Sequence, residues 1–129
     1  MLKVDVYKQS NYPINPKKIK IFLGEFFFSK GIVSDAEVSV AIVGGKKMLA
    51  LAKKYLKEHG QLAHNVLSFT PEETGKAFAY PPDGVVHLGE IIICFPKVVE
   101  EAKKEGVLIE TKGLELIKHG ALHLLGIHN

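Results

Sequence analysis

The sequence predicts an α+β fold in which one small mixed β-sheet of about four strands is packed with helices. Short segments that alternate apolar and polar residues are interspersed with longer segments whose apolar residues recur at helical spacing. The chain of 129 residues has the length of one ordinary domain, so we expect a single domain over residues 1–129. Its hydrophobic fraction of 47% is enough for a buried core without disulfides or a structural metal.

The N-terminal half contains two predicted strands and two predicted helices. Residues 2–9 alternate apolar and polar side chains, which suits a half-buried strand. Apolar residues then recur at helical spacing over residues 17–30, and Gly31 is placed to end that helix. Residues 37–43 alternate again and are rich in β-branched side chains, so they predict a second strand. An amphipathic pattern over residues 46–57 predicts the second helix.

The C-terminal half repeats this mixture of strands and helices. Residues 64–69 are short, apolar and favourable for a strand, and the Gly-, Pro- and Glu-containing residues 70–82 predict an exposed loop. Residues 85–94 predict a fourth strand, whose nearly continuous apolar second half is typical of a strand covered on both faces. Two helices follow, at residues 96–104 and 110–125. The predicted site helix is the second of these, near the C-terminus.

Composition and charge exclude several classes of protein. The longest apolar runs are only a few residues, which excludes a transmembrane helix, and the N-terminus lacks the apolar segment of a secretory signal. The single cysteine, Cys94, excludes an internal disulfide and favours a reducing compartment, so we expect a cytoplasmic protein with no membrane partner. All 17 positive charges are lysines, and the net charge is +3. This balance permits salt-sensitive attraction to RNA, although a solvated lysine surface is the simpler explanation from charge alone.

Histidines gather at the end of the chain, where the last eleven residues, HGALHLLGIHN, hold three of the six. On a helix, His119 and His123 are one turn apart, with Cβ atoms about 6 Å from each other. Gly126 can adopt the left-handed conformation that ends a helix, and His128 could then fold back beneath an ion bound by the pair. Three protein ligands and an open fourth position are what a catalytic zinc site requires. We therefore expect one zinc per chain, held by His119, His123 and His128.

Two observations leave the nature of this helix open. A histidine pair at i and i+4 also occurs as hydrogen-bonded or solvated side chains without a metal. The usual zinc helix, H-E-x-x-H, has a glutamate after the first histidine as general base, whereas this chain has Gly120 there, which weakens a metalloprotease interpretation. Because Leu116 and Leu122 flank the histidines, we expect them to line a cleft with apolar walls.

Three blocks of the sequence resemble the YbeY-type ribosomal RNA maturation endoribonucleases, a family of single-domain metal-dependent hydrolases. Residues 119–126 match the first eight positions of the family's C-terminal signature, H-G-x-L-H-L-x-G-Y-D-H. Residues 65–69 resemble its T-D-V-L-S-F strand, and residues 88–94 resemble its L-G-D-I-x-I-S strand. With the spacing between these blocks, the resemblance covers essentially residues 35–129.

The resemblance implies a zinc-dependent endoribonuclease specific for single strands, acting in maturation of the 3′ end of 16S ribosomal RNA and in ribosome quality control. Its partners would be ribosomal RNA and the small ribosomal subunit, with neither DNA nor a membrane. His119 and His123 would act in catalysis as well as in metal binding. Lys57 is the nearest basic substitute for an arginine that the family has and this chain lacks. Glu90 is a candidate general base if it reaches the site from its strand.

The chain departs from the family's pattern at its third metal ligand. The family's third histidine lies ten residues after the first, where this chain has Asn129, and a histidine falls one position earlier, at His128. We favour His128, because imidazole is the better zinc ligand, while a role for Asn129 or an altered site stays open. Two other functions also stay open: a non-catalytic ribosome-associated factor that keeps the fold, and a metal-dependent hydrolase of another substrate. The sequence does not determine the oligomeric state.

Overall fold

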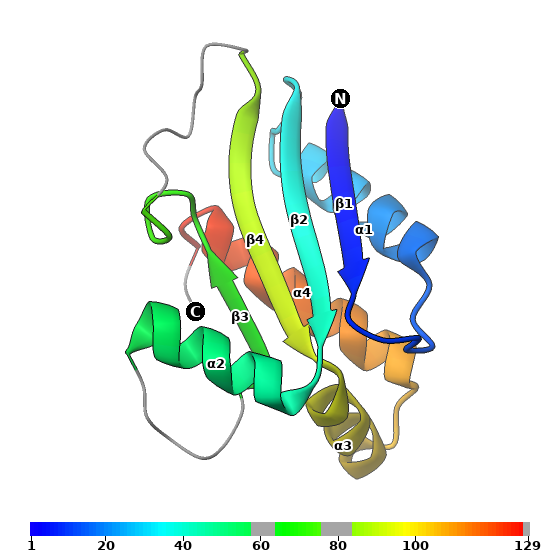
Figure 1. Ribbon diagram of the computed structural model, residues 1–129. Coiled ribbons are helices and arrows are strands. Elements are labelled where there is room, and N and C mark those ends of the chain that lie inside the picture. The colour runs from blue at the N-terminus through cyan, green and yellow to red at the C-terminus, as the bar shows by residue number, and fades with distance from the viewer. Residues whose placement is uncertain (58–63, 76–83, 128–129) are drawn as a thin grey trace.

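The computed structural model describes residues 1–57, 64–75 and 84–127, which form a sheet of four strands packed with helices (Figure 1). Its elements in chain order are β1 (Leu2–Lys8), α1 (Pro16–Ser29), β2 (Ala36–Val43), α2 (Gly45–Leu56), β3 (Val66–Phe69), β4 (Val86–Cys94), α3 (Phe95–Glu105) and α4 (Ile109–Leu124). The predicted α+β fold is confirmed, and every element lies close to its predicted bounds.

The sheet is mixed, with the strand order β1-β2-β4-β3. Strands β1, β2 and β4 are parallel, and β3 pairs antiparallel with β4 at one edge. The register aligns Asp5 with Ser39, Ser39 with Glu90, and Glu90 with Phe69. Side chains directly opposite one another share a face of a sheet, so these residues form one row across all the strands.

The helices cover the two faces of the sheet unequally. Figure 1 shows α1 and α4 behind the sheet, α2 in front of it on the β3 side, and α3 beyond the end of β4. The larger core cluster lies on the face with α1 and α4, and includes the fully buried Phe27, Ile91 and Ile117. A smaller cluster under α2 includes Met48 and Ile92. Among the described residues, no helix covers the side of this second face at β1.

The cores explain why these segments fold as they do. Apolar side chains at helical spacing in α1 and α4 bury one stripe each, while β2 and the second half of β4 bury side chains on both faces. In the described part of the chain, no helix combines the length and the apolar character needed to cross a lipid bilayer.

Candidate metal centre

Helix α4 packs closely against β4 and β3 at Gly120. A Cβ atom at this position would lie 2.8 Å from Cγ2 of Ile91 and 3.4 Å from Cβ of Ser68. Because Ile91 is fully buried, that methyl group has little room to move. The glycine after His119 is therefore required for packing, and a glutamate at this position would point into the sheet instead of toward a metal.

The histidine pair, His119 and His123, lies on the side of α4 that is turned away from the core. Ile117 and Ala121 on the opposite side are fully buried. His119 is exposed, and the side chain of His123 is 34% exposed. Both imidazoles therefore border solvent, and the pair is more open than the apolar cleft predicted from its leucine neighbours.

Helix α4 ends directly after the histidine pair. Gly126 has a φ of 75°, in the left-handed region, and its N–H donates to the carbonyl of His123 over 2.9 Å. The N–H of Ile127 donates to the carbonyl of Leu122, also over 2.9 Å. Together these two bonds form a Schellman motif, which ends the helix as the glycine predicts. The predicted third ligand, His128, and its alternative Asn129 lie outside the described residues.

A carboxylate from a distant part of the chain reaches His123. Nε2 of His123 lies 3.1 Å from Oε1 of Glu73, in the turn after β3. The same carboxylate oxygen accepts the backbone N–H of Thr70 over 2.8 Å. Partial burial alone would raise the pKa of Glu73, but the hydrogen bonds from Thr70 and His123 outweigh it, so this pKa lies below its ordinary value.

Glu73 is a neighbour of His123 that the sequence interpretation missed. It falls in the predicted exposed loop, for which no function was inferred. The spacing of Thr70 and Glu73 is that of a capping box. This signal predicts the tight turn, but it does not predict that Glu73 contacts His123. The contact with His123 spans 50 residues of sequence, so only the packing of α4 beside β3 brings the two side chains together.

The other two predicted catalytic residues belong to the opposite side of the sheet. Glu90 lies on the α2 face of β4, in the row with Asp5 and Ser39, whereas α4 covers the other face. Lys57 follows α2 and is exposed, with a left-handed φ of 56°. The structure places His123 next to Glu73, and it does not place Glu90 or Lys57 on the face that carries the histidine pair.

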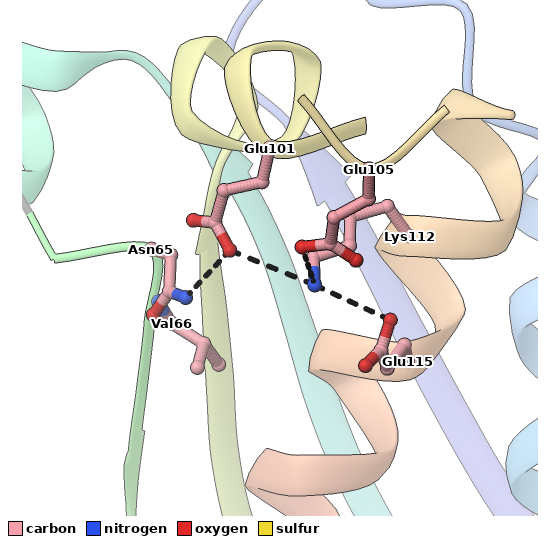
Figure 2. Close-up of polar contacts among 6 residues, drawn as sticks. All are labelled: Asn65, Val66, Glu101, Glu105, Lys112 and Glu115. Carbon is pink, nitrogen blue, oxygen red and sulfur yellow. Dashed lines mark hydrogen bonds and ion pairs between the residues drawn. The ribbon is translucent and has the colours of Figure 1, made fainter. Parts of the chain in front are cut away.

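A buried lysine anchors the N-terminal half of the helix that carries the pair (Figure 2). Lys112 is only 6% exposed, and its Nζ donates to Glu105 over 2.8 Å and to Glu115 over 3.3 Å. Glu101 lies 3.7 Å from the same nitrogen and accepts a hydrogen bond from Asn65 beside β3. The hydrogen bond to Glu105 is the main reason that the pKa of Lys112 is raised, against the effect of burial. This network joins α3, α4 and β3.

The donor set of the site fits a divalent ion only in part. Two imidazoles one turn apart on a helix suit the nitrogen preference of zinc. However, within residues 1–57, 64–75 and 84–127 there is no group of three or more His, Cys, Asp or Glu side chains that could hold a metal. A complete site therefore needs a ligand from outside these residues.

A protein-family comparison gives a match over nearly the whole chain. Residues 7–128 match the family model described as endoribonuclease YbeY. Curated relatives with the same description include one from Azoarcus sp. strain BH72, 37% identical over 94 residues, and one from Burkholderia pseudomallei strain K96243, 36% identical over 95 residues. These alignments cover 73% and 74% of this chain.

The matched relatives are longer than this chain. The alignments span 36% of the Azoarcus protein and 46% of the Burkholderia protein. A third relative, from Stenotrophomonas maltophilia strain K279a, is 34% identical over 100 residues, which are 75% of this chain and 58% of that protein. The chain thus spans about one third to three fifths of the length of these relatives.

The fold also has a counterpart among solved structures. It is similar to the solution structure of TM1509 from Thermotoga maritima, with a TM-score of 0.60 and 21% sequence identity. The similarity covers 95% of this chain and 71% of that one. At this identity the likeness supports the fold alone.

Proposed function

The chain belongs to the YbeY endoribonuclease family, and from this premise we propose that it is a metal-dependent endoribonuclease that cuts single-stranded RNA during ribosomal RNA maturation. The observation that carries the proposal is the histidine pair on the solvent side of α4, with the helix ending directly after it at the left-handed Gly126. A helix end of this kind allows the residues that follow to supply a third ligand to the pair.

In this proposal, His119, His123 and His128 hold one zinc ion. When bound, zinc supplies Lewis-acid chemistry, which polarises water and phosphate oxygens. Metal-binding histidines usually donate their second ring N–H to a carboxylate, which fixes the tautomer and the orientation of the ring. Glu73 is placed for this role, because its carboxylate oxygen lies 3.1 Å from Nε2 of His123. We assign Glu73 as a positioning residue and leave Glu90 out of the proposed site.

A polyanionic substrate agrees with the distribution of lysines. Helix α2 and the residue after it carry five lysines and no acidic residue: Lys46, Lys47, Lys53, Lys54 and Lys57. All five are exposed. Lysine contacts a phosphate as a point charge, and several lysines together attract an RNA backbone in a salt-dependent way. Lys57 belongs to this group, which supports a role in binding phosphate on the α2 side.

The proposal is tested by incubating the protein with single-stranded RNA and with duplex RNA, with zinc and after chelation. We expect zinc-dependent cleavage of the single strand that His119→Ala abolishes. The matched control is His87→Gln, because His87 pairs with Glu37 on β2, away from the histidine pair. RNA binding without cleavage under all conditions would instead support a non-catalytic ribosome-associated factor. Cleavage that persists in His119→Ala would contradict the proposed site.

A further inference from the structure

The part of the α2 face that no described helix covers contains a hollow of about 310 Å³, on the side of the sheet away from the histidine pair. Strands β1, β2 and β4 form its floor, and the first turns of α2 form one wall. Ligand pockets in proteins typically have volumes of about 300–1,000 Å³. The hollow is therefore large enough for one small organic ligand.

The lining combines an apolar floor with a few polar groups. Ala41 and Ile92 from the sheet and Leu51 from α2 supply apolar surface, and the apolar part of the lining predominates. Tyr7 on β1 also lines the hollow and is 59% exposed, so its ring is accessible as a stacking surface. Lys47 on α2 lines the wall and carries a positive charge. These features suit a flat, partly apolar ligand with an anionic end.

The polar groups of the floor are arranged in one row. Asp5, Ser39 and Glu90 lie on neighbouring strands in register, and all three line the hollow. Since neighbouring strands are about 4.8 Å apart, the two carboxylate-bearing residues are about 10 Å apart at the backbone, with the hydroxyl between them. Carboxylates accept hydrogen bonds and cannot donate them when ionised. A ligand edge that faces Asp5 must therefore carry hydrogen-bond donors.

We propose that this hollow binds a guanosine monophosphate unit. Guanine presents two adjacent donors, N1–H and the 2-amino group, which match the two oxygens of one carboxylate. Adenine and cytosine place an acceptor nitrogen beside their amino group, and uracil places carbonyls on both sides of its N–H, so each meets repulsion from a carboxylate. In the bound state Asp5 accepts from the base edge, Tyr7 stacks on the ring, and Lys47 contacts the phosphate. Lys47 also opposes binding of an organic cation.

The site does not depend on nuclease activity, and its ligand could be a free nucleotide or one guanosine residue of an RNA strand. The experiment titrates the full chain with GMP and follows amide chemical shifts. We expect saturable shifts confined to β1, β2, β4 and α2. IMP, which lacks the 2-amino group, should bind about tenfold more weakly because it loses one charge-assisted hydrogen bond. A short oligoribonucleotide with one guanosine, compared with the same strand carrying adenosine, distinguishes a strand residue from a free nucleotide.

Two variants test the residues that carry the proposal. Asp5→Asn removes the acceptor charge and should weaken GMP binding about tenfold, and Tyr7→Leu should weaken it about fivefold through loss of stacking. Glu25→Gln is the control, because this exposed carboxylate on α1 lies on the other face of the sheet. Circular dichroism and thermal melting establish that each variant is folded.

Three results would overturn the proposal. The first is that the chemical shifts do not saturate with GMP or with the guanosine oligonucleotide. At about 10 mM GMP, even millimolar binding is detectable. The second is equal binding of GMP, IMP and AMP. The third is binding of a polyamine in the hollow in place of the nucleotide. None of these results bears on cleavage by the histidine pair, so they leave the proposed nuclease function to its own test.

Discussion

One carboxylate on a turn contacts both the imidazole of His123 and the backbone of its own turn. Glu73 is bonded to the Thr70 backbone and to His123 at once, so the turn after β3 and the C-terminal half of α4 share one hydrogen-bonded group. The residue types of the histidine pair were evident from sequence, because HGALHLLG places two imidazoles one helical turn apart. Glu73 could not be identified from the sequence, because a glutamate in a polar loop has no periodicity that would indicate which residue it contacts.

Replacing Glu73 tests its positioning role. Glu73→Gln keeps the size of the side chain but removes the charge that orients His123, so zinc affinity should fall by about 10–100-fold. Isothermal titration with zinc measures the affinity, and thermal melting of the metal-free protein checks the fold. Glu72→Gln is the matched control, since the adjacent glutamate is exposed and should leave the affinity unchanged. Equal zinc affinity in both variants would contradict the assignment.

We expect the buried Lys112 to stabilise the folded protein through its contacts with three glutamates. In Lys112→Met the aliphatic stem is kept, but three glutamates lose their shared cation, so the free energy of unfolding should fall by about 1–3 kcal/mol. Urea denaturation at neutral pH measures the change. Lys118→Met, at an exposed position of the same helix, should change it by less than about 0.5 kcal/mol. Similar losses in both variants would show that the network does not anchor α4.

The same lysine predicts a dependence of stability on alkaline pH. Its pKa is raised in the folded protein above the ordinary value of 10.5, so the folded state holds this proton more tightly than the unfolded chain does. Its contribution is therefore fully present below pH 10.5 and is lost as the pH rises through the raised pKa. From neutral pH to pH 10.5, the difference in unfolding free energy between the wild type and Lys112→Met should stay constant. Above pH 10.5 it should shrink. A difference that grows with alkaline pH would contradict this sign.

At the scale of elements, α4 is the helix on which the site depends, and its contacts explain its sequence. Gly120 permits the close approach to Ile91, Lys112 ties the helix to α3, and Gly126 ends it. The existence and bounds of α4 followed from helical spacing and the terminal glycine. The reason for a glycine at position 120 did not follow from the sequence. Without the distance between Gly120 and β4, the absence of the usual glutamate could only be interpreted as a departure from the motif.

The packing at Gly120 has a direct test in a pair of glycines on the same helix. Gly120→Ala places a Cβ 2.8 Å from the buried Ile91 side chain, so overpacking should destabilise the protein by about 1–3 kcal/mol. At Gly113 the nearest atom would be Cδ1 of Ile14 at 3.8 Å, an ordinary contact, so Gly113→Ala should stabilise α4 by up to about 1 kcal/mol. Denaturant melts of both variants measure these changes. Stabilisation by Gly120→Ala would show that the close approach is not tight.

At the scale of the whole molecule, the helices cover the two faces of the sheet unequally. The histidine pair and the hollow therefore lie on opposite sides of the sheet. Helices α1 and α4 close one face, and α4 carries the histidine pair; among the described helices, only α2 covers the other face, on its β3 side (Figure 1). Alternation and helical spacing predicted the strands and helices, but the strand order and the face on which each helix lies arise from tertiary packing. Glu90 illustrates the consequence, because its place on the α2 face follows from the register of β4 with β2 and could not be obtained from its own strand.

Zinc content tests the central claim most directly. The full chain, purified without chelator and saturated with zinc, should contain about one zinc ion by mass spectrometry of the metal, as the open three-histidine site predicts. His119→Ala and His123→Ala should each lose that ion, while His87→Gln should keep it. A chain that retains zinc in both of the first two variants, or that binds none when the pair is intact, would contradict the account.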